Sequence, residues 1–453
     1  MNRFSRLDIA VGALSLFLLA ALGLVLWRGD QVGVSVLAVS PLDGAAAAAS
    51  APVAITFGEA MDAASVESRF SLQPQTAGRF IWRDNTLYFL PEQAFAEGQT
   101  YTVRLASGAS TYLGHVLAEE LSWSFTTRSP GMAFMRSSDQ GAELWTLTDL
   151  EGSPRQVTDM AGDVFDFAVS VDGQQILYSA FNEQAGIDLW LVGRQGEDNR
   201  MVLNCGLDRC YAPDWSADGR VAYSRAPGPL NPGEGYGAPR IWLLEPATGQ
   251  SVRLHADTQK IGYGPSWSPE AGRLAYYDGV QNRIVVVDML SGQEIYLPSR
   301  VGVVGSWMPD GDQMLYYDTK LADGLALYTI FRADFSTEDI LPFFEPQPAD
   351  GDYSMPTLSP SGEWVALRVR PADGGPADQV WVTPADGRFA LTAAETEASL
   401  FSDLSWDPQS RYLLYHRMQL GVGNPVPEVW VWDRSSGTTR LLVRDASAPA
   451  WLP

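Results

Sequence analysis

Short apolar runs separated by turn residues fill the chain from residue 34 to its end. Some alternate apolar and polar residues, as in Thr100-Tyr101-Thr102-Val103-Arg104-Leu105, and others are rich in aromatic and β-branched residues. Alternation with a period of two, in runs of about four to eight residues bounded by Gly, Pro and Asp, predicts β-strands. No segment beyond residue 34 shows a helical period of useful length. The pattern therefore predicts an all-β fold.

One short phrase returns seven times in the C-terminal two thirds of the chain. Each copy has a core-type residue, then Ser or a substitute, then a tight turn around Pro-Asp-Gly or part of it, then a β-rich run. A repeat of this length predicts one structural unit used again and again around a shared core. Successive copies lie 40 to 52 residues apart. The equivalent positions are Val169, Trp215, Trp267, Trp307, Leu358, Trp406 and Trp451.

Each repeat contains four predicted strands, the content of a propeller blade of ~40–50 residues. Residues 131–158 contain second, third and fourth strands but no first strand, whereas residues 448–452 contain a first strand and nothing after it. Because an open ring would leave a strand edge unpaired, we expect 448–452 to lie beside 131–136 in one mixed blade. This arrangement gives a seven-bladed propeller over residues 130–453, with a six-bladed one as the alternative.

The repeated phrase resembles that of the TolB-type, WD-repeat-like propeller family. The resemblance rests on copies such as Ser306-Trp307-Met308-Pro309-Asp310-Gly311 and on the aliphatic–Trp–aliphatic strands that follow, such as Leu189-Trp190-Leu191. Val169 and Leu358 depart from the family pattern, in which Trp is usual at these positions. We expect the repeated Trp side chains to pack between neighbouring sheets rather than to stack on a ligand.

Residues 34–128 form a separate unit with about seven predicted short strands, which suggests an antiparallel sandwich. Stretches such as Phe57-Gly58-Glu59-Ala60-Met61-Asp62 and the terminal Trp123-Ser124-Phe125-Thr126-Thr127 resemble the SbsA-type bacterial Ig-like domain. The resemblance implies a spacer or adhesive module on a cell surface. The Ala45–Ala49 run is predicted to be a solvated loop. The strands expected here are 53–57, 71–73, 86–90, 100–105 and 121–127.

The N-terminal segment, residues 1–30, is predicted to hold a cytoplasmic tip and a transmembrane anchor. Ile9 to Trp27 is an uncharged run of 19 residues, close to the ~20 that a membrane-spanning helix needs. Arg3 and Arg6 precede the run and favour a cytoplasmic N-terminus. A cleaved signal peptide is the alternative, although Leu24-Val25-Leu26-Trp27-Arg28 is a poor cleavage site. We therefore expect a single-pass membrane protein with its bulk extracytoplasmic, at the cell surface or in the periplasm.

Charge and cysteine content narrow the classes of partner. The formal charge of −23 repels phosphate backbones, so no nucleic-acid partner is expected. No calcium-loop spacing occurs, and three His with two Cys do not suggest zinc, so no metal or cofactor is predicted. Cys205 and Cys210 are the only cysteines; we expect a disulfide, with free thiols as the alternative.

No catalytic residues are predicted. A Gly-x-Ser-x-Gly nucleophile elbow is absent, and acidic pairs are expected by chance among 54 acidic residues. The sequence thus favours a membrane-anchored binding or scaffold protein that is not an enzyme. Its propeller would bind a protein, a peptide or a cell-envelope polymer. A propeller hydrolase or lyase acting on cell-surface glycan or peptide is the alternative.

The partner is expected on the face that bears the loops between second and third strands and between blades. Long insertions fall in these loops, and functional residues concentrate on loops held by a rigid scaffold. The disulfide would brace a loop on the same face. Arg and Tyr are favoured at binding hot spots. The candidate contact residues, at or near the bases of the insertions, are Arg225, Tyr236, Arg370 and Arg417.

Overall fold

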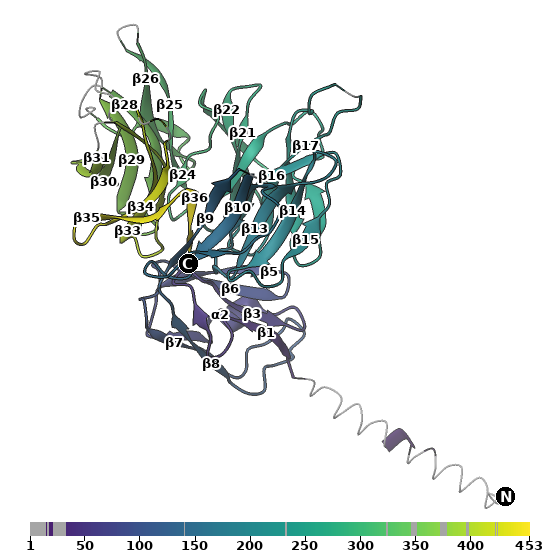
Figure 1. Cartoon of the computed structure of the whole chain (residues 1–453). Coiled ribbons are helices and arrows are strands. Elements are labelled where there is room, and N and C mark those ends of the chain that lie inside the picture. Colours follow the sequence, from purple (N-terminus) through teal and green to yellow (C-terminus); the bar gives the residue numbers. More distant parts are fainter. Residues whose placement is uncertain are drawn as a thin grey trace, which may run out of the picture.

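The computed structural model describes Ser15, Leu18–Ala20 and residues 33–453, except 140, 232, 323–324, 346–350, 372–377, 396–397, 422 and 424. The predicted anchor, Ile9–Trp27, lies outside the described residues apart from Ser15 and Leu18–Ala20. Within the described residues, no helix is long and apolar enough to cross a membrane. The described chain is all-β, with one β-sandwich below a ring of sheets (Figure 1).

Two four-stranded sheets form the N-terminal sandwich. The first has the order β1 (Val36–Ser40), β3 (Val53–Phe57), β6 (Thr86–Pro91), β5 (Gly78–Arg83). The second has the order β2 (Ala46–Ala47), β8 (Leu121–Thr127), β7 (Thr100–Leu105), β4 (Phe70–Gln73), and the short helix α2 (Ala63–Glu67) lies before β4. All five strands expected in this unit are confirmed.

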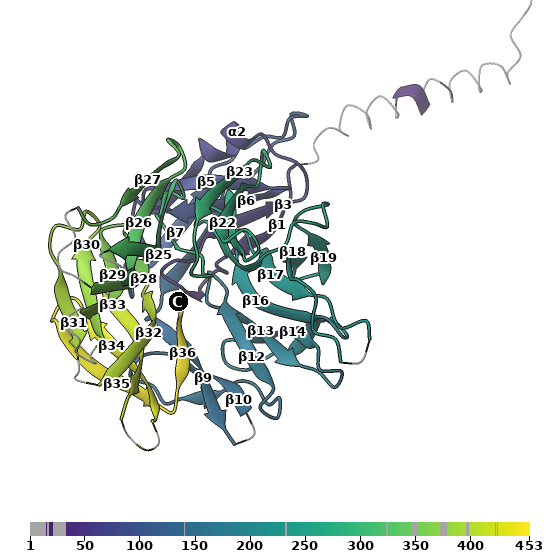
Figure 2. The same cartoon turned by 90° about the horizontal axis from the view of Figure 1, so that it is seen from above.

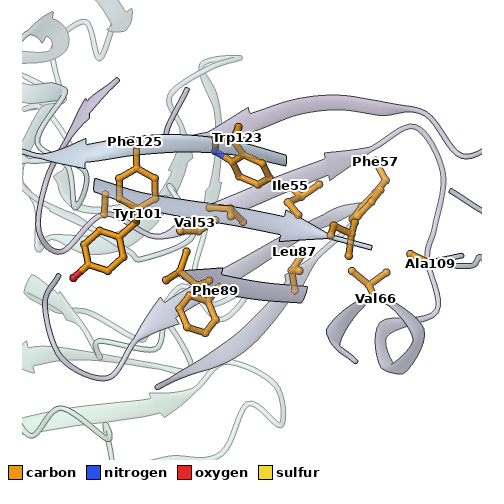
Figure 3. Packing of buried hydrophobic residues seen from close by; sticks show 14 of the residues in the cluster. Val53, Ile55, Phe57, Val66, Leu87, Phe89, Tyr101, Ala109, Trp123 and Phe125 are labelled. Atoms are coloured by element: carbon orange, nitrogen blue, oxygen red, sulfur yellow. The ribbon is translucent and has the colours of Figure 1, made fainter. Parts of the chain in front are cut away.

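Inward-facing residues of both sheets fill the sandwich core, as period-two alternation requires. Ile55 and Phe57 of β3 share one core cluster with Trp123 and Phe125 of β8, and Ile55 lies near Trp123 (Figure 3). The prediction of a solvated Ala45–Ala49 loop is wrong. Ala47, Ala48 and Ala49 are each at most 5% exposed, because small side chains let the backbone pass over this core.

The ring consists of antiparallel sheets whose strands follow chain order (Figure 2). One eight-stranded sheet contains two four-stranded units, joined by the single pair Ile187↔Arg209. Those units are β12 (Val164–Val169), β13 (Gln175–Phe181), β14 (Ile187–Gly193), β15 (Arg200–Leu203), and β16 (Arg209–Trp215), β17 (Val221–Ala226), β18 (Arg240–Glu245), β19 (Gln250–Arg253).

Four further sheets have four consecutive strands each. They are β20 (Tyr263–Trp267), β21 (Arg273–Asp278), β22 (Arg283–Asp288), β23 (Glu294–Pro298); β24 (Ser306–Trp307), β25 (Gln313–Ala322), β26 (Leu325–Asp334), β27 (Asp339–Pro342); β28 (Gly351–Leu358), β29 (Trp364–Pro371), β30 (Gln379–Pro384), β31 (Leu391–Glu395); and β32 (Ser399–Trp406), β33 (Tyr412–Gln419), β34 (Pro427–Asp433), β35 (Thr438–Arg444).

The two ends of the segment that forms the ring close it as expected. The last sheet has the order β11 (Arg155–Gln156), β10 (Gly141–Leu147), β9 (Gly131–Ser138), β36 (Ser447–Leu452). β36 pairs with β9 through Trp451↔Met132 and Ala450↔Ala133. The prediction that the 448–452 strand lies beside 131–136 is therefore confirmed.

The repeated Trp residues join neighbouring sheets, which agrees with their expected structural role. The indole N–H of Trp215 donates to Ala168 O at 3.2 Å, that of Trp406 to Thr357 O at 3.1 Å, and that of Trp451 to Ser405 O at 2.9 Å. Each acceptor directly precedes the equivalent position of the previous repeat. The same hydrogen bond thus recurs at three contacts between sheets, whereas the indole N–H of Trp307 donates to Ser266 Oγ at 3.2 Å.

The inner strands share a bulge that the sequence did not predict. Three residues before the repeated Trp or Leu, the backbone is left-handed, with φ of 51° at Ala212, 53° at Met355, 53° at Asp403 and 49° at Ala448. The strand register shifts at the same points. A bulge bends its strand and redirects its side chains, so the residues before it fan out at the loop face of the ring.

Candidate binding surfaces

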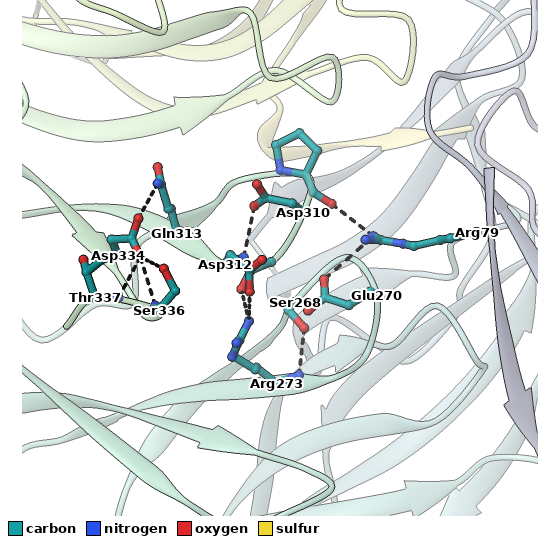
Figure 4. Close-up of polar contacts among 12 residues, drawn as sticks. Arg79, Ser268, Glu270, Arg273, Asp310, Asp312, Gln313, Asp334, Ser336 and Thr337 are labelled. Carbon is teal, nitrogen blue, oxygen red and sulfur yellow. Dashed lines mark hydrogen bonds and ion pairs between the residues drawn. The ribbon is translucent and has the colours of Figure 1, made fainter. Parts of the chain in front are cut away.

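The tight turns after the inner strands face the N-terminal sandwich. Arg79 of β5 donates to Pro309 O at 3.1 Å and lies 3.8 Å from the Glu270 carboxylate (Figure 4). Arg83 donates to Asp218 O at 3.1 Å and forms an ion pair with Glu245. The sandwich therefore occupies the tight-turn face of the ring.

Arg128, just after β8, ties the two parts to the end of the chain. Its guanidinium donates to Pro453 O at 2.9 Å, Asp172 O at 2.8 Å and Ala46 O at 2.7 Å. Burial, together with the nearby Arg194 cation, lowers the pKa of Arg128 to about 10. Three carbonyls from three separate segments compensate for this burial.

A cavity of about 680 Å³ remains between the sandwich and the tight turns. Both parts line it, so its walls depend on how the sandwich docks. Its lining includes Leu90, Pro91, Trp215, Trp267, Trp307 and Pro309.

The opposite face, which we call the loop face, points away from the sandwich (Figure 1). Three of the four predicted contact residues lie here on separate strands, and no described contact joins them. Arg225 (β17) donates to Asp208 at 2.7 Å, Arg370 (β29) to Asp378 at 3.0 Å, and Arg417 (β33) to Ser399 Oγ at 3.2 Å. Their role in binding remains a prediction.

Tyr236, the fourth predicted contact residue, belongs to a cluster that the sequence did not predict. The Arg209 guanidinium carbon lies 3.9 Å from the centre of the Tyr236 ring and 5.7 Å from that of Phe181. Phe165 lies edge-on to Phe181 at 5.6 Å and to Tyr211 at 6.1 Å. We call these five residues the aromatic–arginine patch.

The aromatic–arginine patch is partly exposed, and a disulfide and a hydrogen bond hold its segments in place. Phe165 is 45% exposed and Phe181 is 36% exposed. The Cys205 and Cys210 sulfurs are bonded in a disulfide, directly before Tyr211. The Tyr236 hydroxyl donates to Ala185 O at 2.5 Å, so the loop between β17 and β18 is fixed to the turn after β13.

A weak signal for the patch exists in the repeat. Phe165 and Tyr211 each stand four residues before the repeated position, at Val169 and Trp215. Aligning the repeats at that offset would have pointed to two aromatic residues on neighbouring blades. Nothing in the sequence linked Arg209 or Phe181 to them, because those contacts depend on how strands from two sheets meet.

Two partly buried carboxyl groups, those of Asp166 and Asp214, lie in the inner strands β12 and β16. Asp214 accepts the Trp267 N–H at 2.7 Å, and burial raises its pKa to about 7. Asp166 accepts the Ala212 N–H at 2.7 Å, and burial raises its pKa to about 6. The Asp214 carboxyl bridges two neighbouring sheets, and the Asp166 carboxyl bridges the two units of the eight-stranded sheet. Both are structural uses of a group with a shifted pKa.

Ser402, Asp403 and His416 meet at the same face. Ser402 Oγ lies 2.9 Å from His416 Nδ1 and donates to Asp403 at 2.8 Å, and Asp403 lies 3.5 Å from the same ring nitrogen. His416 Nε2 is buried and has no hydrogen-bond partner among the described residues. In a Ser-His-Asp triad, Ser and Asp use opposite ring nitrogens, so this arrangement differs from a triad. Within the described chain, no group of three or more His, Cys, Asp or Glu could hold a metal ion.

Comparisons with known proteins agree with the fold. Residues 30–127 match the family described as bacterial Ig-like domain. A prolyl endopeptidase structure has a TM-score of 0.50 and 11% identity, covering 84% of this chain and 51% of its own. TolB from Acinetobacter baumannii has a TM-score of 0.43 and 18% identity, covering 73% of this chain and 82% of its own. No curated protein matches the sequence. The chain combines a bacterial Ig-like domain with a β-propeller fold, as predicted.

Proposed function

We propose that this chain is a membrane-anchored, extracytoplasmic binding or scaffold protein, without catalysis, that holds a protein, peptide or envelope polymer on its loop face. One observation carries the proposal. The Ig-like domain covers the tight-turn face, and the loop face presents exposed aromatic rings around an arginine that has no acidic partner among the described residues. Arg and aromatic residues dominate binding hot spots.

The propeller in this proposal has seven blades. Counting the eight-stranded sheet as two blades is supported by its single connecting pair, Ile187↔Arg209. The four sheets β20–β35 and the mixed sheet closed by β36 supply the other five. Seven copies of the repeated phrase match this count.

The membrane anchor is the Ile9–Trp27 run, with the propeller outside. Its support is the length of the uncharged run and the Arg residues before it. Protease added to intact spheroplasts should then digest the propeller, and a lysed sample is the control for its sensitivity. Survival of the propeller in intact spheroplasts would reject this orientation.

A hydrolase or lyase is the second candidate function, and the Ser402–His416 contact at 2.9 Å favours it. A fluorophosphonate probe tests it, because such probes label activated serine nucleophiles. We expect no labelling of the full chain in detergent. Labelling that Ser402→Ala abolishes would support the enzyme instead.

A further inference from the structure

Arg209 is a cation without a counter-charge. On the same face, Arg225 pairs with Asp208 at 2.7 Å, and both Arg368 and Arg370 pair with Asp378. The side chain of Arg209 forms no hydrogen bond or ion pair with any residue that the structure describes. In a chain with 54 acidic residues and a charge of −23, a carboxylate partner could readily have been placed beside it. Its guanidinium is instead held over the Tyr236 ring.

The rings around Arg209 do not form a flat platform. The planes of Phe165 and Phe181 meet at 82°, and those of Phe165 and Tyr211 at 85°. A flat sugar ring stacks best on a face that is parallel to it, whereas edge-to-face rings leave a corrugated apolar surface. Such a surface suits an aromatic or aliphatic side chain that inserts between them.

The patch is pre-organised for binding. The Cys205 N–H donates to the buried Asp188 carboxylate at 2.7 Å, and the same carboxylate accepts from Asn182 at 3.0 Å. These bonds, the disulfide and the Tyr236–Ala185 bond fix the segments that carry the four patch residues other than Phe165. Less conformational freedom is then lost when a partner binds.

We propose that the aromatic–arginine patch binds an extended peptide segment in which a carboxylate side chain lies beside an aromatic or aliphatic one. The carboxylate pairs with Arg209, and the apolar side chain packs on Phe165 and Phe181. The net charge of −23 repels a polyanion as a whole, whereas one carboxylate gains locally from one arginine. This inference rests on the proposed binding function and adds the chemistry of the partner.

The test is a selection of random heptapeptides displayed on phage against the full chain in detergent. We expect enriched peptides to carry Asp or Glu within two positions of an aromatic or aliphatic residue. For the best synthetic peptide, Arg209→Gln should weaken binding by about 10- to 100-fold. Arg209→Lys should bind with intermediate affinity, because it keeps the charge but not the planar fork.

Arg253→Gln is the matched control. Arg253 also lies over a ring, 5.9 Å from Trp242, but outside the patch, so binding should not change. Melting temperatures of all variants show whether the fold is intact, and Arg209→Lys decides the case if Arg209→Gln is unstable.

The proposal would be overturned if the selection gave no enrichment or enriched peptides without a carboxylate, or if Arg209→Gln bound the peptide as tightly as the wild-type chain. It would also be overturned by tighter binding of an anionic polysaccharide such as alginate, or by self-association of the chain that Arg209→Gln abolishes. The last two would assign the patch to a glycan or to a second copy. Failure of the spheroplast experiment would reject the membrane orientation while leaving peptide binding in detergent unaffected, so the two proposals fail separately.

Discussion

At the scale of single residues, Asp214 of the inner strand β16 has a carboxyl group with no cation beside it among the described residues. Asp214 lies between two sheets, where its carboxylate accepts the backbone N–H of Trp267 at 2.7 Å. One hydrogen bond does not offset the loss of hydration of a charged carboxylate. The pKa of Asp214 is therefore raised to about 7.

This shift makes stability depend on pH. Between the ordinary pKa of 3.8 and about 7, the folded chain binds a proton that the unfolded chain has lost. The contribution of Asp214 to stability is thus full below pH 4 and is lost as the pH rises through 7. Asp214→Asn keeps an acceptor without the charge, so it should reduce the fall in the free energy of unfolding between pH 5 and pH 8, which is on the order of 2–4 kcal/mol. Urea denaturation at the two pH values measures this difference.

Asp334→Asn is the control for this prediction. Hydrogen bonds from Ser336 lower the pKa of Asp334 to about 2, so this group is ionised in both states across pH 5–8 and should leave the slope unchanged. Equal slopes for the wild-type chain and Asp214→Asn would contradict the assignment.

The residues of the candidate surface were only partly predictable from the sequence. The sequence predicts Tyr236 as a contact residue because it lies in the long Pro-Gly-rich stretch of residues 226–240 on the expected face. The same reasoning predicts Arg225 and Arg370, yet each is paired with an aspartate. Whether an arginine pairs with an acid or stacks on rings depends on contacts between loops, and those have no periodic signal.

At the scale of elements, the positions of the strands were largely predictable, whereas the bulges that set the directions of their side chains were not. The second strands β21 and β33 are predictable, because residues 274–277 and 412–415 within them are all aromatic or aliphatic. β5, with every residue partly exposed, lacks the clear alternation that marks its neighbours. The bulges at Ala212 and Asp403 have no Gly to signal a left-handed backbone.

The closing strand β36 offers a prediction at this scale. Trp451→Ala keeps the pairing with β9 but removes a side chain that is 6% exposed, at a cost of about 3–5 kcal/mol. Deleting residues 446–453 should destabilise the ring more, because it also exposes the edge of β9. Differential scanning calorimetry measures both.

Leu290→Ala is a matched surface control, since Leu290 is 98% exposed; it should change the melting temperature little. An unchanged melting temperature in the truncated chain would show that β36 does not close the ring.

At the scale of the whole molecule, the Ig-like domain and the propeller are joined by side chains that reach main-chain carbonyls. Arg83 reaches Asp218 O, and Arg128 reaches both Asp172 O and Pro453 O. Hydrogen bonds to carbonyls do not depend on the side chain at the acceptor position. The interface therefore depends on the shape of the tight turns, which the repeat makes alike around the ring.

These contacts should couple the unfolding of the two parts. Removing both cations with Arg83→Ala and Arg128→Ala leaves the carbonyls without donors, and hydrogen bonds to charged groups contribute about 1.5–3 kcal/mol each. We expect calorimetry to show one transition for the wild-type chain and two for the double variant, with the Ig-like domain and the propeller unfolding separately.

Arg104→Ala is the control. The exposed Arg104–Glu120 pair lies within one sheet of the sandwich, away from the propeller, and such pairs contribute little. A double variant that unfolds in one transition at the wild-type temperature would show that these arginines do not hold the domains together, and that packing around the cavity between them does so instead.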